Sequence, residues 1–454
     1  MKRVLKIKVM LLLLFATCGL ADINRVPLDY PTIQAAIDAS LNGDTVLVAP
    51  GTYTGDGNRD IDFMGKAITV KSEEGPQTCI IDCQGSPNEP HRGFYFHNSE
   101  DTNSVVEGFT ITNGYDTYNM GGGIYCDASS PHIENCIVSA NTALFGGGIA
   151  CIDSQANIIR CIIQNNSADY AGGIRITGTT STSSLLTITN CFIIGNKAKD
   201  SGGGIHCYGD IIMTNCFVVG NKAEGSSGGG IYCYGKTTLL NCTISGNYAG
   251  SYGGGGIHLN TGKISNSIIY GNLIPTSVGI EIVQEPHGAG GCRPDLIKIT
   301  HSIVGSDPNA IDVPRCYSGE WLYVDPLFAN PGNWDPNGTP DDPNDDFWVD
   351  GDYHLKSQAG RWNPNSESWI QDDVTSPCID SGDPNNPIQH EPFPNGGIIN
   401  MGTYGGSSQA SKSYFGKPVC QTIIAGDING DCIVDIKDFA LMIAHWLEDH
   451  TPLQ

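Results

Sequence analysis

Gly121-Gly122-Gly123-Ile124 opens a block of about 25 residues that occurs six times in succession. Each copy begins with a small-residue run and an isoleucine, continues to an Asn-Cys pair or a close variant, and ends on an asparagine. The isoleucines are Ile124, Ile149, Ile174, Ile205, Ile231 and Ile257, and the final asparagines are Asn141, Asn166, Asn196, Asn221, Asn247 and Asn272. Such a period indicates a solenoid, because one copy cannot bury its apolar face alone and must stack on its neighbours.

The aligned copies contain short apolar runs with a period of two. One aligned position holds Cys126, Cys151, Ile176, Cys207, Cys233 and Leu259, and another holds Ile133, Ile158, Ile188, Met213, Leu239 and Ile264. Alternating runs between Gly, Asn and Ser indicate strands of about three to five residues, and a helical period is absent from them. We therefore predict an all-β, right-handed parallel β-helix, with about three short strands per turn and turns stacked ~4.8 Å apart.

The glycines and asparagines are expected to shape the corners between the strands. Corners need positive φ angles, which Gly adopts freely and Asn tolerates. Asparagine side chains at one corner of successive turns can also hydrogen-bond along the stack. We favour this structural role for the asparagines over a role in ligand binding.

The repeat resembles the Gly-Gly-Ile … Asn-Cys … Asn units of secreted bacterial β-helix proteins, including pectate-lyase-like folds and polymorphic outer-membrane-protein repeats. The segments Thr32–Asp38 and Gly43–Tyr53 are similar to the opening of pectate-lyase-like β-helices. The resemblance covers roughly residues 28–410 and implies the fold. It implies less about function, since such folds include lyases, hydrolases, adhesins and passive scaffolds.

The first residues have the pattern of a secretory signal peptide. Four basic residues precede an apolar run from Val9 to Ala16, and Gly19-Leu20-Ala21 offers small residues for cleavage after Ala21. The run is too short to span a bilayer. Cleavage removes those four basic residues and takes the formal net charge from −24 to −28. We expect a secreted or extracytoplasmic protein, in the periplasm or at the cell surface, without transmembrane segments after cleavage, and the acidity argues against nucleic acid as a partner.

Seventeen cysteines in a secreted chain would ordinarily suggest disulfides. Nine of them occupy two repeat positions that also accept Ile, Leu or Ser, and a position of that kind is a packing position. Stacked cysteines would have parallel Cβ vectors, which disfavours bonding between them, so we expect thiols. The pairs Cys79/Cys83, Cys292/Cys316 and Cys420/Cys432 are disulfide candidates, and Cys378 has no evident mate.

Four segments are predicted along the chain. Residues 31–41 form an amphipathic stretch, with Ile33, Ala36, Ile37 and Leu41 on one side, that would cap the solenoid. Residues 330–352 are expected to form a long loop, and 376–383 and 399–406 resemble closing turns of the same fold. The predicted boundaries are 1–21 for the signal peptide, 22–410 for the β-helix, 411–424 for a linker and 425–454 for a calcium-binding module.

The last segment contains a calcium-loop pattern. Side-chain oxygens come from Asp427, Asn429, Asp431, Asp435 and Asp438 at loop positions 1, 3, 5, 9 and 12, and Ile433 would offer its backbone carbonyl at position 7. With the apolar face that follows, the loop resembles one repeat of a type I dockerin, although dockerins pair two repeats and Cys432 stands where Gly is expected. The resemblance implies bound Ca²⁺ and a cohesin-like or cell-surface partner. The alternative is a C-terminal cap with a solvated acidic loop.

One repeat position between the inward columns must point outward. It holds Tyr125, Ala150, Arg175, His206, Tyr232 and His258, and the next outward position holds Asp127, Ile152, Thr177, Tyr208, Tyr234 and Asn260. Rings and planar hydrogen-bonding groups in a row suit an extended oligosaccharide. The candidate substrate-binding residues are therefore Tyr125, Asp127, Arg175, His206, Tyr208, Tyr232, Tyr234 and His258. Ordinary cross-strand stacking is the alternative explanation.

Catalytic residues cannot be named from the sequence. Glycoside hydrolysis needs two carboxylates ~5–10 Å apart, and Asp127 has no aligned acidic partner. A calcium-assisted lyase would need clustered acids beside a base, and no such cluster aligns with Arg175 or His206. We predict a secreted protein that binds extracellular polysaccharide; whether it also degrades it, as a lyase or a glycoside hydrolase, stays open. The alternative is a non-catalytic surface, structural or adhesin-type solenoid.

Overall fold

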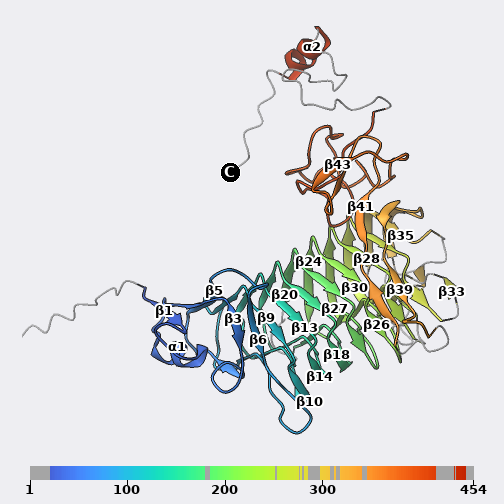
Figure 1. Ribbon diagram of the computed structural model, residues 1–454. Helices are drawn as coiled ribbons and strands as arrows, with labels where there is room; N and C mark the ends of the chain where they lie inside the picture. Colours follow the sequence, from blue (N-terminus) through green and yellow to red (C-terminus); the bar gives the residue numbers. More distant parts are fainter. Residues whose placement is uncertain are drawn as a thin grey trace, which may run out of the picture.

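The computed structural model describes residues 21–178, 185–250, 253–275, 277–278, 281–284, 297–306, 311–312, 317–339, 345–415, 434 and 436–445. Figure 1 shows successive turns of the chain stacked along one axis, with their strands side by side. The parallel β-helix predicted from the repeat is confirmed. Each regular turn has four strands rather than the three predicted, because a further short strand forms after each final asparagine.

Three parallel ladders make up the 29-stranded sheet. The first ladder comprises β4 (Ile61–Asp62), β7 (Phe94–Phe96), β11 (Ile124–Asp127), β15 (Ile149–Ile152), β19 (Ile174–Thr177), β23 (Ile205–Cys207), β27 (Ile231–Leu240), β30 (Ile257–Ser265), β34 (Ile282–Gln284) and β36 (Ile311–Asp312). The second comprises β1 (Ile23–Val26), β2 (Thr45–Val48), β5 (Thr69–Ser72), β8 (Val105–Glu107), β12 (His132–Glu134), β16 (Asn157–Ile159), β20 (Leu185–Thr189), β24 (Asp210–Thr214), the later parts of β27 and β30, β35 (Ile297–Val304) and β37 (Tyr317–Leu322).

The remaining strands form a third parallel ladder and a separate fourth ladder, which ends in one antiparallel strand. The third ladder comprises β3 (Gly51–Tyr53), β6 (Cys79–Asp82), β9 (Thr110–Thr112), β13 (Ile137–Ser139), β17 (Ile162–Gln164), β21 (Phe192–Ile194), β25 (Phe217–Val219), β28 (Thr243–Ser245), β31 (Ile268–Tyr270) and the end of β35. The fourth comprises β10 (Tyr115–Met120), β14 (Thr142–Phe145), β18 (Ser167–Tyr170), β22 (Lys197–Ala198), β26 (Lys222–Ala223), β29 (Tyr248–Ala249), β32 (Leu273–Ile274) and the antiparallel β33 (Ser277–Val278).

The two asparagine positions of the repeat have different structural roles, one at a corner with positive φ and the other in hydrogen bonds along the stack. The asparagine of the Asn-Cys pair turns the corner with positive φ, at 51° in Asn135 and 54° in Asn190, and Arg160 does the same at 52°. The final asparagine is buried and hydrogen-bonds along the stack: Asn166 Nδ2 donates to Asn196 Oδ1 at 3.0 Å. The structural role predicted for the asparagines is confirmed.

The cysteines fill the interior as thiols. All twelve described cysteines are free and buried, including Cys79 and Cys83, so the disulfide predicted between those two is wrong. The column that ends in Ser267 also hydrogen-bonds: the Cys161 backbone N–H donates to Cys191 Sγ, and the Cys242 N–H donates to Ser267 Oγ at 3.1 Å. Because Sγ and Oγ both accept this hydrogen bond from the preceding turn, serine can replace cysteine at this repeat position. Cys292, Cys316, Cys420 and Cys432 lie outside the described residues.

Helix α1 (Ile33–Ala39) covers the N-terminal end of the core, as predicted. Ile33, Ala36 and Ile37 are buried in the main cluster, and Thr32 caps the helix by accepting the Ala35 N–H. Leu41, expected on the same side, is exposed because the helix ends before it. No helix in the described part of the chain is both long and apolar enough to cross a membrane.

The segment after β37 packs on the outside of the solenoid instead of adding turns. It contains three antiparallel strand pairs: β38 (Phe328–Asn330) with β41 (Asp352–Leu355), β39 (Asn333–Asp335) with β40 (Phe347–Val349), and β42 (Arg361–Asn363) with β43 (Ser368–Ile370). Figure 1 shows β39 lying across the solenoid strands. The long loop predicted over 330–352 is therefore wrong.

A second hydrophobic core joins this segment to the third ladder. It contains Phe217, Val219, Ile268, Ile303, Phe328, Tyr353, Leu355, Cys378, Ile379 and Met401. The Gly402 N–H donates to the Asn266 carbonyl at 2.8 Å, and Thr403 Oγ1 donates to the Cys216 carbonyl at 2.8 Å. Residues 376–383 and 399–406, expected to be closing turns, form no strand and lie against the outer face.

Candidate functional site

The outward row predicted from the repeat is a continuous line along the first ladder. Tyr125, Ala150, Arg175, His206, Tyr232 and His258 are consecutive register partners. Tyr95 extends the row by one turn, since it pairs with Tyr125. Sequence reasoning missed Tyr95 because its turn lacks the Gly-Gly-Ile signature, although Phe94-Tyr95-Phe96 has the same alternation.

The middle of the row forms a cluster of rings and cations that we call the central cluster. Its members are Arg175, His206, Tyr208, Tyr232, Tyr234 and His258. The rings of Tyr208 and Tyr234 stack at 4.9 Å with an interplanar angle of 5°, and their side chains are 46% and 37% exposed. The Arg175 guanidinium lies 4.8 Å from the Tyr208 ring and 5.3 Å from the Phe145 ring.

Three members of the central cluster are hidden beneath those rings. Arg175, His206 and His258 are only 8%, 2% and 6% exposed. The prediction that they face outward is correct in register, but flanking rings exclude solvent from them. Burial, followed by the charges of Arg175 and His258, lowers the pKa of His206 to about 2, so its imidazole is neutral at physiological pH.

A second group of polar side chains lies at the N-terminal end of the row. This N-terminal cluster contains Asp62, Arg92, Tyr95, His97, Tyr125 and Asp127. Tyr95 stacks on His97 at 4.0 Å and on Tyr125 at 5.1 Å, and the Arg92 guanidinium lies 5.2 Å from both tyrosine rings. His97 Nε2 lies 3.1 Å from Asp62 Oδ2. Of these six residues, the sequence identified only Tyr125 and Asp127.

The N-terminal cluster contains a second carboxylate, Asp62, besides Asp127. Burial first, and then the nearby Asp127, raise the pKa of Tyr125 to about 12. Burial and both Asp127 and Asp62 raise the pKa of Tyr95, so the two carboxylates influence the same ring. Imidazole, phenol and carboxylate groups are those used in general acid–base chemistry. Arg92 is held separately, in an ion pair with Asp116 at 2.5 Å.

The two clusters are separated along the row by Ala150, whose turn contributes no polar group to it. Tyr125 and Arg175 stand two turns apart, or ~10 Å at the usual spacing between strands. The row therefore presents two polar patches in line on one face of the solenoid.

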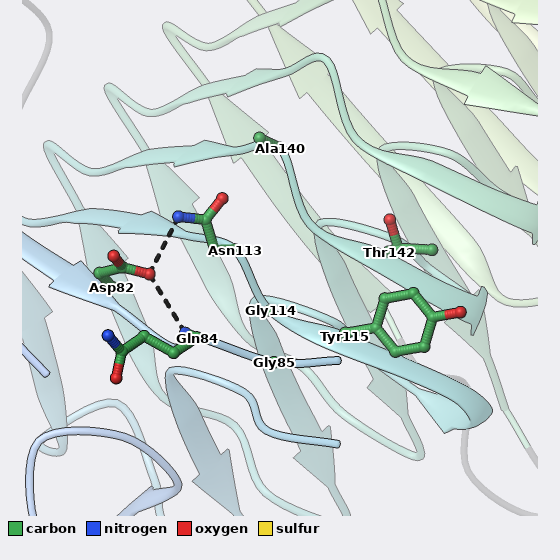
Figure 2. A pocket seen from close by; sticks show the side chains of 8 residues that line it. All are labelled: Asp82, Gln84, Gly85, Asn113, Gly114, Tyr115, Ala140 and Thr142. Atoms are coloured by element: carbon green, nitrogen blue, oxygen red, sulfur yellow. Dashed lines mark hydrogen bonds between the residues drawn. The ribbon is translucent and has the colours of Figure 1, made fainter. Parts of the chain in front are cut away.

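A pocket of about 370 Å³ lies at the corner between the third and fourth ladders. Its lining is Asp82, Gln84, Gly85, Asn113, Gly114, Tyr115, Ala140 and Thr142. Figure 2 shows Asp82 accepting hydrogen bonds from Asn113 Nδ2, at 2.9 Å, and from the Gln84 N–H, at 3.1 Å. Sequence reasoning did not predict this pocket, because most of its lining comes from turns before the regular repeat and only Ala140 and Thr142 come from the first regular copy.

The predicted calcium ligands Asp427, Asn429, Asp431, Ile433 and Asp435 lie outside the described residues. Asp438 lies in helix α2 (Ile436–His445), which begins at Ile436 and so includes the last positions of the predicted loop. Within the described ranges, His, Cys, Asp and Glu form no group of three or more arranged to hold a metal ion.

Comparison with known proteins gives one family match and several structural neighbours. Residues 309–382 match the family described as "Disaggregatase related". No curated protein matches the chain. The pectate lyase Pel9A superposes with a TM-score of 0.50 at 15% identity, covering 85% of this chain and 96% of its own. A PL6 family polysaccharide lyase from Pseudopedobacter saltans superposes with a TM-score of 0.31 at 14% identity, covering 67% of this chain and 92% of its own. The Aspergillus niger pectin methylesterase superposes with a TM-score of 0.28 at 14% identity, covering 68% of this chain and 88% of its own. The likeness to Pel9A shows a shared parallel β-helix fold.

Proposed function

We propose that this protein binds an extracellular polysaccharide along the outward row, with the sugar chain running parallel to the solenoid axis. The observation that carries the proposal is the exposed, stacked pair of Tyr208 and Tyr234 beside the polar groups of the central cluster. Flat rings pack on sugar faces, while neighbouring planar donors hydrogen-bond to hydroxyl groups. The β-helix fold shared with a pectate lyase supports the same substrate class.

Cleavage of the bound polymer is a second candidate function, located at the N-terminal cluster. The contact between Asp62 and His97 favours it, because a carboxylate that holds an imidazole orients it as a base. Tyr125 and Asp127 would lie beside the same sugar, so the chemistry would be that of a lyase or a glycoside hydrolase. The competing proposal is a non-catalytic surface, structural or adhesin-type solenoid.

A polysaccharide panel tests both functions with the full chain. We expect Tyr208→Ala with Tyr234→Ala to weaken binding about tenfold or more, because stacking area on the sugar is lost. The double variant should change the melting temperature little, since both rings are exposed. Phe347→Ala is the matched control, because its ring is as exposed as that of Tyr208 but lies on the outer hairpin.

The outcomes separate the alternatives. Unchanged binding in the double variant, together with a large loss of thermal stability, would show that the stacked rings serve the fold alone. New reducing or unsaturated ends that disappear in His97→Ala would establish cleavage. Binding without new ends would favour the non-catalytic solenoid.

We further propose that the chain is secreted and that residues 425–454 form a calcium-binding, dockerin-like module. The signal-peptide pattern and the oxygen ligands of the loop support this proposal, and helix α2 includes the apolar residues expected to be helical next to the loop. A cohesin-like or cell-surface partner would then bind through that module. We take the solenoid to be right-handed, as crossover connections between parallel strands generally are.

A further inference from the structure

Arg175 is a buried cation without a carboxylate partner. Among the described residues it forms no ion pair, and its Nε donates a hydrogen bond to Thr177 Oγ1 at 3.1 Å. The Nη1 atom is buried and has no hydrogen-bond partner. The other buried or nearly buried arginines are paired: Arg92 with Asp116, and Arg361 with Asp352 and Asp372.

The missing carboxylate is unexpected in this chain. The sequence has 48 acidic residues against 24 Lys and Arg, so acids were available to pair with Arg175. The segment that follows β19, residues 179–184, consists of Thr and Ser alone and supplies no acid either. A buried charge without a counter-charge is costly. The Tyr208 and Phe145 rings compensate the charge of Arg175 in part through cation–π contacts, but they leave Nη1 without a hydrogen-bond acceptor.

A second unpartnered donor stands on the next turn. His206 is the register partner of Arg175, one strand spacing or ~4.8 Å away. Its Nδ1 lies 3.4 Å from Ser201 Oγ, and its Nε2 is buried without a partner. With the Ser201 hydroxyl donating to Nδ1, the ring proton is on Nε2. Arg175 Nη1 and His206 Nε2 are then two N–H donors without acceptors, on residues that are register partners in successive turns.

We propose that Arg175 and His206 form an anion subsite that accepts a carboxylate or sulfate group of the bound glycan. A planar guanidinium matches such groups with paired hydrogen bonds, and these are stronger than bonds between neutral groups. The inference rests on the proposed function, because the subsite lies beneath the exposed Tyr208 ring of the same surface, and that ring must turn aside for the anion to reach the buried donors. It narrows the substrate class to acidic polysaccharides, with uronate or sulfate as the source of charge.

The first test uses small probes and needs no polysaccharide. The melting temperature of the full chain is measured with sodium glucuronate, with glucose and with sodium sulfate at matched ionic strength. We expect glucuronate or sulfate to raise the melting temperature of the wild type more than that of Arg175→Gln, because a ligand of the native state stabilises it. Glucose should give no such difference. A response to glucuronate identifies the uronate source, and a response to sulfate identifies the sulfate source.

Arg160→Gln is the matched control, because Arg160 is more exposed and already pairs with Glu134. Arg175→Lys keeps the positive charge but lacks the paired N–H donors of the guanidinium, so its melting temperature should respond only weakly to glucuronate or sulfate. This variant replaces Arg175→Gln in the comparison if Arg175→Gln fails to fold. Equal shifts for the wild type, Arg175→Gln and Arg175→Lys would overturn the inference.

The second test separates this inference from the proposed function. Uronate-containing, sulfated and neutral polysaccharides are compared by affinity electrophoresis. We expect Arg175→Gln to lose about tenfold in affinity for an acidic polymer, and to lose most of the salt dependence of that binding. If the wild type binds neutral polymers as well as acidic ones, the anion subsite is wrong while the proposed function stands. If no polymer binds but glucuronate or sulfate shifts the melting temperature in the wild type alone, the proposed function fails and the subsite stands.

Discussion

At the residue scale, the buried asparagines form a single hydrogen-bonded line that ends on a carboxylate. Each Nδ2 donates to the Oδ1 of the next turn, from Asn141 through to Asn272. The amide dipoles therefore point the same way, with the donor end at Asn272. There Glu281 accepts N–H groups from Asn272 and, at 2.9 Å, from Gly271. An anion at the positive end of aligned dipoles is a favourable arrangement, as at a helix N-terminus.

Glu281 makes stability depend on pH. Burial raises its pKa to about 7, although the three donated hydrogen bonds act in the opposite direction. A carboxyl whose pKa is raised in the folded state stabilises the protein fully below the unfolded value near 4.3, and this contribution is lost as the pH rises through about 7. We expect the urea midpoint to fall between pH 5 and pH 8, with roughly 3 kcal/mol attributable to Glu281.

Variants isolate the contribution of Glu281. Glu281→Gln removes the titration and should flatten the pH dependence, although the amide would oppose the Gly271 N–H and lower stability at every pH. Glu391→Gln is the comparison, because burial also raises the pKa of Glu391 to about 7, outside the asparagine line. If the wild type and Glu281→Gln have parallel pH profiles, Glu281 is ionised throughout this range and the prediction is wrong.

At the scale of elements, the β39–β40 hairpin is seated on a column of glycines. Trp348 lies over Gly220 and Gly246, where an added Cβ would come within 2.1 Å of its ring at either position. Trp334 Nε1 donates to the Gly246 carbonyl at 2.9 Å, and Lys197 Nζ donates to the Asp346 carbonyl at 2.7 Å. The glycines thus serve both the positive-φ corner and the close approach of an indole.

Gly220→Ala should release this hairpin from the solenoid. The Cβ clashes with the indole, and φ of +59° adds backbone strain of about 1 kcal/mol. Limited proteolysis should cut residues 333–349 faster, and tryptophan fluorescence should shift toward longer wavelength. Gly271→Ala is the matched control: its φ is +71°, but an added Cβ would meet only Ser245 Oγ, at 3.9 Å. Equal cleavage of both variants would show that strain alone, without the indole contact, is responsible.

At the scale of the whole molecule, the two ends of the solenoid are followed by different kinds of structure. Helix α1 buries apolar residues at the first turn, whereas the segment after β37 turns back and packs on the third ladder. Beyond it, α2 exposes Ile436, Phe439 and Ile443. Apolar side chains exposed on one helix suit a binding surface, which is the role proposed for the module.

Calcium titration of the full chain tests the module. The four aspartates of the proposed loop repel one another, and a bound cation removes that repulsion. We expect one calorimetric site with Kd of ~10⁻⁴–10⁻³ M, the range of extracellular modules, and a gain of helical circular dichroism. Asp427→Ala with Asp438→Ala should abolish both signals, while Asp29→Ala with Asp56→Ala, two exposed acids near the N-terminus, should leave them intact. Identical titrations of the two double variants would assign the calcium to another part of the chain.

The sequence by itself determined the parallel solenoid, its inward columns, the asparagine line and the register of the outward row. These follow from local rules, because stacked turns place equivalent residues one strand spacing apart and alternation decides which side chains face inward. Even where a turn strays from the consensus, as at Ile176 and Arg160, the neighbouring turns impose the register.

Only the tertiary structure decided what covers the solenoid and what the outward row exposes. Trp348 and Met401 reach the third ladder through contacts over long sequence separations that no periodicity encodes. Asp62 pairs with Tyr95 and contacts His97 although its own turn lacks the repeat signature. Arg175 and His206 are outward in register yet buried, because rings from neighbouring rows close over them. Register is a property of the repeating backbone, whereas exposure depends on the shape and packing of whichever side chains surround each position.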